Sequence, residues 1–230
     1  MLNKTKHEAI LNRILLDIYT DSHLASLLAF KGGTACYFFY SLPRFSTDLD
    51  FNLLKPEEAD RVMAKIHEIA VQYGTIKEEY HKKNTLFFLI SYGDSDYNVK
   101  IEVSIRGIAA DHYEIRPYYG LPVQLMRQDC MAAHKLVATM DRRRLVNRDL
   151  FDSTYFLKNN WPVNEEVIRN RTGKSKMEYF QELATFVKDL KTKKPQLLDG
   201  LGEVLDAKQK AWVKEKMLEE LIFLLLSAKE

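Results

Sequence analysis

The chain carries FKGGT at residues 30–34 and, after thirteen further residues, DLDF at residues 48–51. A short apolar run ends at the glycines. An apolar and aromatic run, 35–42, follows and stops at Pro43, so the pattern predicts a strand, a tight turn and a buried helix. Paired glycines let the backbone turn tightly and point amide N–H groups outward, where they and the helix N-terminus can hold a phosphate. The first motif, with the Thr34 hydroxyl beside it, therefore predicts a phosphate-binding turn.

The second motif predicts a metal site. Residues 48–54 alternate like a strand, so Asp48 and Asp50 leave one face while Leu49 and Phe51 face the core. Two carboxylates on one face can share a divalent cation. A solvated acidic face is the alternative, but like charges beside a tight turn repel each other unless solvent or a cation intervenes. The two motifs together favour the metal and phosphate interpretation.

A two-metal site needs a third carboxylate on a neighbouring strand, and Glu102 is the candidate. It lies between the core-type residues Ile101 and Val103 on a predicted strand. This alternation fits a metal ligand and equally fits an exposed surface position, so both interpretations stay open.

The remaining patterns predict an α+β domain over residues 1–125 and a helical domain over 126–230. Helical spacing near 8–19 and a helix from Pro56 to about Tyr73 accompany a sheet of about four or five strands. Its later strands are expected at 78–82, 85–92 and 98–105. The helical half is expected to contain helices at 129–140, 148–157, 177–190 and 212–226.

Composition sets the outer limits. The 230 residues are 46% hydrophobic and 29% charged, which excludes disordered and collagen-like chains. The formal charge of +2 means that any nucleic-acid affinity must come from a local patch. Two cysteines without a CxxC pair predict a reduced, cytoplasmic setting. The longest clean apolar run, 221–226, is far short of the ~20 residues that span a bilayer, so no membrane association is expected.

These motifs resemble the signature of the DNA polymerase β-like nucleotidyltransferase superfamily. More narrowly, FKGGTA at 30–35 and RFSTDLDF at 44–51 resemble the AbiEii/AbiGii toxins of type IV toxin–antitoxin and abortive-infection systems. The resemblance extends to HKLVA at 134–138 and RDLFD at 148–152, and so covers about residues 25–160. Two departures are Thr34, where many superfamily members have Ser, and Glu102, where polymerases have Asp.

The resemblance implies a polymerase β-like domain with a mixed sheet, followed by a helical domain that completes the active-site cleft. It implies transfer of a nucleotide from an NTP, with Mg²⁺ (or Mn²⁺), to the 3′ end of tRNA, and a partner antitoxin. The implied metal ligands are Asp48, Asp50 and Glu102, and the implied nucleotide-binding residues are Lys31, Gly32, Gly33, Thr34, Arg44, Ser46 and Lys135. Asp149 is implied as a further catalytic acid beside Asp48, Asp50, Glu102 and Lys135.

The residues themselves leave alternatives for several of these roles. Lys135 alone fits a solvated helix face. Asp152 has a sufficient structural explanation as an acid in the first turns of a helix that can pair with Arg148. Arg44 and Ser46 are expected either to contact the NTP, to shape the entry loop, or merely to lie in a solvated loop.

The acceptor is the least determined feature. A local basic cluster is a candidate for RNA contact through the phosphate backbone and comprises Arg142, Arg143, Arg144 and Arg148. Nucleotidyl transfer to a protein or a small molecule would use the same acids. A catalytically silent module that binds nucleotide or a partner protein is the alternative from another class.

Overall fold

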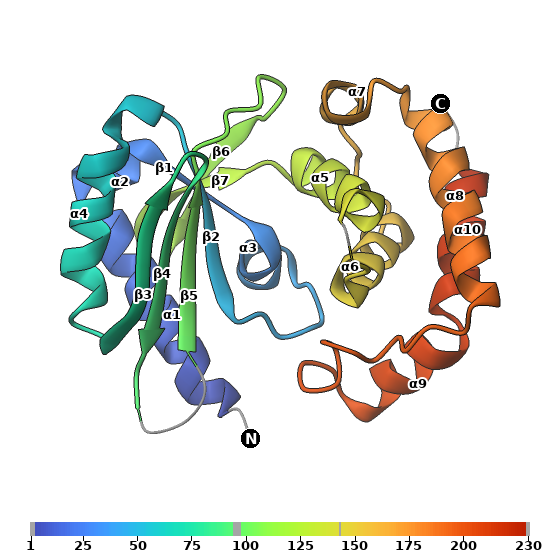
Figure 1. Cartoon of the computed structure of the whole chain (residues 1–230), viewed down its shortest axis with the longest axis horizontal. Coiled ribbons are helices and arrows are strands. Elements are labelled where there is room, and N and C mark those ends of the chain that lie inside the picture. Colours follow the sequence, from blue (N-terminus) through green and yellow to red (C-terminus); the bar gives the residue numbers. More distant parts are fainter. Residues whose placement is uncertain (1–2, 94–97, 143, 229–230) are drawn as a thin grey trace. The chain divides into compact units, whose positions relative to one another are not determined.

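The computed structural model describes residues 3–93, 98–142 and 144–228 and divides into two compact units, Met1–Met126 and Arg127–Glu230 (Figure 1). The first unit contains a mixed sheet with helices, and the second is helical, so the predicted α+β class is confirmed. Across the described ranges, no helix combines the length and apolar character needed to cross a bilayer.

Within the described part of the first unit, seven strands form one sheet in the order β3-β4-β5-β2-β1-β7-β6. β2 pairs in parallel with β5, β1 pairs in parallel with β7, and the remaining neighbours are antiparallel. The strand bounds are β1 Leu28–Lys31, β2 Asp48–Leu53, β3 Thr75–Lys82, β4 Thr85–Ser91, β5 Asn98–Ser104, β6 Tyr113–Tyr118 and β7 Leu121–Met126.

The helices of this unit cover both faces of the sheet. Figure 1 shows α1 (Lys4–Thr20), α2 (Ser22–Leu27) and α4 (Ala59–Ala70) on one side and α3 (Gly32–Tyr40) on the other. A short 3₁₀ turn, Pro56–Glu58, leads into α4. The core contains the regularly spaced apolar residues of α1, namely Leu11, Ile14, Leu15 and Ile18. It also contains alternate strand residues, namely Leu49, Phe51, Phe88, Ile101 and Val103. The other faces of β2 and β5 are therefore left for polar side chains.

The prediction of four or five strands is wrong because the hairpin of β6 and β7 was not anticipated. Each of its strands contains a proline, and Pro117 and Pro122 pair directly opposite each other near the turn. Proline cannot donate to a ladder, so these segments give a weak strand pattern. The sheet tolerates them because β6 is an edge strand and β7 pairs with β1 at Leu125 and Phe30, away from Pro122.

The second unit packs helices on one another around Leu136, Leu150, Phe156, Phe180, Leu183, Leu221 and Leu225. Its helices are α5 Gln128–Asp141, α6 Asn147–Lys158, α7 Glu165–Thr172, α8 Lys176–Thr192, α9 Ala207–Glu215 and α10 Met217–Ser227. Trp161 stacks on Phe156 with a centroid separation of 4.0 Å, which closes the end of α6. α10 packs on both α6 and α8.

The single helix expected at 212–226 is two helices that meet at Lys216. The backbone of Lys216 leaves the helical region at φ −127°, and its N–H bonds to the Trp212 carbonyl. α9 is mostly polar, whereas α10 is apolar, so the bend lets α10 enter the core without burying α9. The Trp212 indole N–H donates across the bend to Glu220 at 2.7 Å.

Candidate active site

The glycine turn consists of Gly32 and Gly33, which begin α3 directly after β1 and lie against the acidic strand β2. Gly32 has φ +80°, and a Cβ there would lie 2.5 Å from the Asp50 Oδ2 atom. A Cβ at Gly33 would lie 2.8 Å from the Ser46 hydroxyl oxygen and 2.9 Å from an Arg44 guanidinium nitrogen. The position of Gly32 therefore requires glycine because of its left-handed backbone and the close Asp50 carboxylate. A Cβ at Gly33 would instead displace the Ser46 and Arg44 side chains. The glycine turn, the loop that carries Arg44 and Ser46, and Asp50 on β2 therefore pack against one another.

The acids lie on one face of two adjacent parallel strands. In the register of β2 and β5, Asp48 is opposite Lys100 and Asp50 is opposite Glu102. The predicted common face of Asp48 and Asp50 agrees with the burial pattern, in which Leu49 between them is buried. Glu102 lies on this same face with a side chain that is 41% exposed. Glu102 is therefore both partly exposed and on the same face as Asp48 and Asp50. Its exposure is thus compatible with a role as a metal ligand.

Lys100 extends its ammonium group into the acids. Its Nζ lies 3.2 Å from Asp48 Oδ2 and 3.6 Å from Glu102 Oε2. Burial lowers the pKa of Lys100, but the carboxylates of Asp48, Asp50 and Glu102 outweigh burial and hold that pKa above its ordinary value. The ammonium therefore stays charged at neutral pH.

Asp50 experiences the opposite balance. Burial raises the pKa of its carboxyl, and the nearby Asp48 and Glu102 carboxylates raise it further, while Lys100 and Lys31 oppose the rise. Lys31 is placed beside Asp50 by the antiparallel register of β1 and β2. A half-buried carboxylate held above its ordinary pKa is a group that gains from a cation.

This donor set fits a hard divalent cation. Three carboxylates from two strands offer only oxygen ligands, which Mg²⁺ and Mn²⁺ prefer. The Lys100 ammonium already provides a positive charge between two of them, so the site is one in which a cation is stabilised. Asp48, Asp50 and Glu102 are the candidates to hold the metal; their oxygens do not all lie within 4.8 Å of one another in the described structure, so the side chains would converge on it.

The residues around the turn are buried rather than solvated. Arg44 and Ser46 are 2% and 5% exposed, so their interpretation as residues of a solvated loop is wrong. An Arg44 guanidinium N–H donates to the Phe45 carbonyl at 3.2 Å. The buried Thr34 hydroxyl donates to the Asp48 carbonyl, which fixes the start of β2. Contact of these residues with a phosphate stays a prediction.

A second charged cluster lies in the helical unit. Lys135 Nζ on α5 is 2.9 Å from Asp149 Oδ1 and 3.2 Å from Asp152 Oδ2, both on α6. The two acids are 1% and 0% exposed, so each contributes to a buried ion-pair network. The alternative of a solvated face is wrong for Lys135. The structure pairs Asp152 with Lys135, and its pairing with Arg148 stays a prediction.

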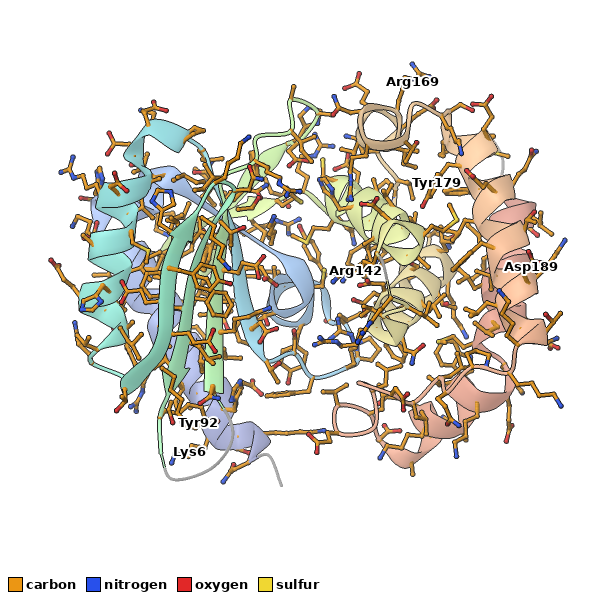
Figure 2. The ribbon with its side chains drawn as sticks, in the orientation of Figure 1. Lys6, Tyr92, Arg142, Arg169, Tyr179 and Asp189 are labelled. Carbon is orange, nitrogen blue, oxygen red and sulfur yellow. The ribbon has the colours of Figure 1, made fainter. Side chains whose placement is uncertain are left out.

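The arginines near this cluster differ in their surroundings. Arg142, labelled in Figure 2, places its Nε 2.8 Å from Asp149 Oδ2. Arg144 is exposed, and Arg148 is half-buried beside a cavity of about 380 Å³. Arg143 lies outside the described residues. The structure thus gives Arg142 an acidic partner and leaves RNA contact by these residues as a prediction.

Comparison with known proteins decides the family. A model of the family "Nucleotidyl transferase AbiEii toxin, Type IV TA system" matches residues 13–221. The chain belongs to the AbiEii family. The match extends well beyond the motifs at 25–160 and includes most of the helical unit. The protein is therefore a nucleotidyltransferase of the toxin class, and the family implies an NTP substrate and a cognate antitoxin.

Solved structures share the fold of this AbiEii protein. JHP933 from Helicobacter pylori is 20% identical, with a TM-score of 0.56 over 98% of this chain and 94% of that one. An antigenic nucleotidyltransferase-like protein from Paracoccidioides brasiliensis is 15% identical, with a TM-score of 0.51 over 86% and 95% of the two chains. No curated protein matches the chain.

The structure thus gathers the predicted site residues of the AbiEii protein in two groups. Lys31, Gly32, Gly33, Thr34, Arg44, Ser46, Asp48, Asp50 and Glu102 lie together in the first unit. Lys135 and Asp149 lie together in the second, with Arg142. That the two groups serve one cleft stays a prediction.

Two residues of the first group's surroundings were missed. Lys100 could have been found from its spacing, since it is two residues before Glu102 on a strand and must share its face. His7 on α1 offered no such signal. Its buried ring bonds through Nε2 with the Thr47 carbonyl at 3.0 Å and through Nδ1 with the Tyr92 hydroxyl at 2.6 Å. Lys6 lies over the same Tyr92 ring (Figure 2). Through His7, α1 holds Thr47, the residue that precedes Asp48.

Proposed function

We propose that this AbiEii protein is a Mg²⁺-dependent enzyme that transfers a nucleotide from an NTP to the 3′ end of tRNA, and that this transfer makes it toxic. The observation that carries the proposal is the register of β2 and β5, which brings Glu102 beside Asp50 and next to the glycine turn. The cytoplasm would supply both the NTP and the tRNA.

In such a transfer, a terminal hydroxyl of the acceptor attacks the α-phosphorus, a new phosphodiester bond forms and pyrophosphate leaves. Catalysis therefore consists mostly of alignment and charge stabilisation. The bound divalent cation would supply Lewis-acid stabilisation of the reacting oxygens. Asp48, Asp50 and Glu102 would hold it, and the amides of Gly32 and Gly33 would hold the phosphates.

Lys135 would add a fixed positive charge for the leaving pyrophosphate. Its ion pairs with Asp149 and Asp152 restrict the flexible side chain to one position. Asp149 and Asp152 thereby act as positioning residues for Lys135. The exposed Arg144 supports an RNA acceptor, because local cations are needed on a chain with a net charge of only +2.

The decisive experiment incubates the purified protein with total bacterial tRNA, Mg²⁺ and each α-labelled NTP in turn. We expect label on tRNA with at least one NTP and no label with the Asp48→Asn variant. Asp189→Asn is the matched control, since Asp189 is exposed on α8 (Figure 2) and the substitution is the same.

Label on protein or on a small molecule instead of tRNA would overturn the acceptor and retain the chemistry. Equal labelling by wild type and Asp48→Asn would overturn the assignment of the acids. Omission of Mg²⁺, with EDTA added, should abolish labelling as completely as Asp48→Asn does.

A further inference from the structure

Lys100 is the residue of the acid site for which the proposed function gives no role. It comes from the middle of β5, opposite Asp48 and two residues before Glu102. Its ammonium group lies 3.2 Å from one carboxylate and 3.6 Å from the other. The Lys100 ammonium occupies the space that a metal bound by the same oxygens would need, and it neutralises part of their negative charge.

The charges at the site are unequal without a metal. Three carboxylates, the Lys100 ammonium and the Lys31 ammonium beside Asp50 leave one net negative charge. Without Lys100, the three carboxylates would repel one another more strongly and attract a cation more strongly. The Lys100 side chain is 30% exposed and has a flexible four-carbon stem, so its head can leave the carboxylates without disturbing the strand.

We propose that Lys100 is an internal cation of the acid site that competes with the divalent metal for Asp48 and Glu102, and so sets the affinity of the site for metal. The inference rests on the proposed function, since it assumes that these acids are the metal ligands. Asp48 and Glu102 would hold the metal only with oxygens that the Lys100 ammonium leaves. Lys100 thus lowers the affinity of the acid site for metal.

The test measures Mn²⁺ binding without NTP or RNA, by the paramagnetic resonance signal of free Mn²⁺ at low ionic strength. Lys100→Met removes the charge and keeps most of the stem, and we expect it to bind Mn²⁺ about tenfold more tightly than wild type, or better. Lys100→Arg keeps the charge and should stay close to wild type. Lys77→Met is the matched control, because Lys77 is exposed on β3 of the same sheet.

Equal or weaker binding by Lys100→Met would overturn the proposal. Lys100→Gln carries the same expectation of tighter binding and serves if the methionine variant does not fold. Thermal unfolding gives a second readout: Mn²⁺ should raise the melting temperature of Lys100→Met more than that of wild type, relative to EDTA. An equal rise in both proteins would also overturn it.

The result is separable from the fate of the proposed function. Mn²⁺ affinity is measured without any acceptor, so tighter binding by Lys100→Met can stand even when no label reaches tRNA. Conversely, equal Mn²⁺ affinities with normal tRNA labelling by wild type would remove the role of Lys100 alone. Asp48→Asn, which removes a ligand, should weaken Mn²⁺ binding in either case.

Discussion

At the scale of single residues, we expect Asp50 to serve the proposed activity and to lower the free energy of unfolding at neutral pH. Burial raises the pKa of its carboxyl, so the folded protein binds this proton more readily than the unfolded chain does. Stability is then lost as the pH rises through the folded-state pKa. Asp50→Asn should therefore increase the free energy of unfolding at pH 7.5 in EDTA. This gain should vanish below the ordinary pKa of 3.8, where the carboxyl is protonated in both states. The same variant should abolish nucleotide transfer. Urea unfolding at both pH values checks this.

The control is Asp60→Asn, since the Asp60 side chain is 95% exposed on α4 and should show no such gain. A lower stability of Asp50→Asn at pH 7.5 would mean that Lys31 and Lys100 stabilise the carboxylate more than burial destabilises it. The contrast between the two variants separates a half-buried site acid from a surface acid.

The residue-scale features that the sequence could predict are local ones. The need for glycine at the turn and the common face of Asp48 and Asp50 follow from backbone sterics and the period of a strand. The pairing of Asp50 with Glu102 does not, because it depends on which strands become neighbours. The ion pairs of Lys135 depend similarly on how α5 packs against α6.

At the scale of elements, the long helix α8 begins with a residue whose side chain caps its N-terminus. Ser175 forms a capping box, in which its side chain accepts from the Glu178 N–H and the Glu178 carboxylate accepts from the Ser175 N–H. Ser175→Ala should lower the free energy of unfolding by ~1 kcal/mol and leave nucleotide transfer unchanged. Urea unfolding with the tRNA labelling assay checks both expectations. Thr185→Ala on the same helix is the control.

Thr185 is exposed in the interior of α8, where its hydroxyl bonds back to the Gln181 carbonyl. Alanine there should be neutral or slightly stabilising, because alanine has the higher helix propensity. A loss as large as that of Ser175→Ala would show that α8 is sensitive to any change and that the cap has no particular value.

Elements with strong periodicity were predictable, and those with mixed signals were not. The helix after the glycine turn and the strands β4 and β5 lie within a residue or a few of their expected bounds. The hairpin of β6 and β7 was missed because of its prolines. The break at Lys216 was missed because α9 and α10 together keep helical spacing, and only the packing of α10 on α6 and α8 requires the bend.

At the scale of the whole molecule, the change of hydrophobic period separates the two units. Alternation of period two gives way to helical spacing near residue 127, and the compact units divide between Met126 and Arg127. The strand order could not be predicted in the same way, because β1 lies between β2 and β7, which are distant in sequence. Such non-local pairings are decided by the core as a whole.

The balance of charge over the whole chain leads to the last prediction. Thirty-four basic and thirty-two acidic side chains create no general attraction for RNA, so the proposed tRNA acceptor must be held by a few local cations. Arg144 is exposed and is the test position. The log of the apparent tRNA affinity should fall with the log of the salt concentration. Arg144→Gln should make this fall less steep, by roughly 0.7 to 1 in the slope, whereas Lys77→Gln should not change it. Labelling kinetics between low and moderate salt measure both slopes. An unchanged slope for Arg144→Gln would exclude this arginine from the RNA interface, and a flat profile for wild type would argue against an RNA acceptor altogether.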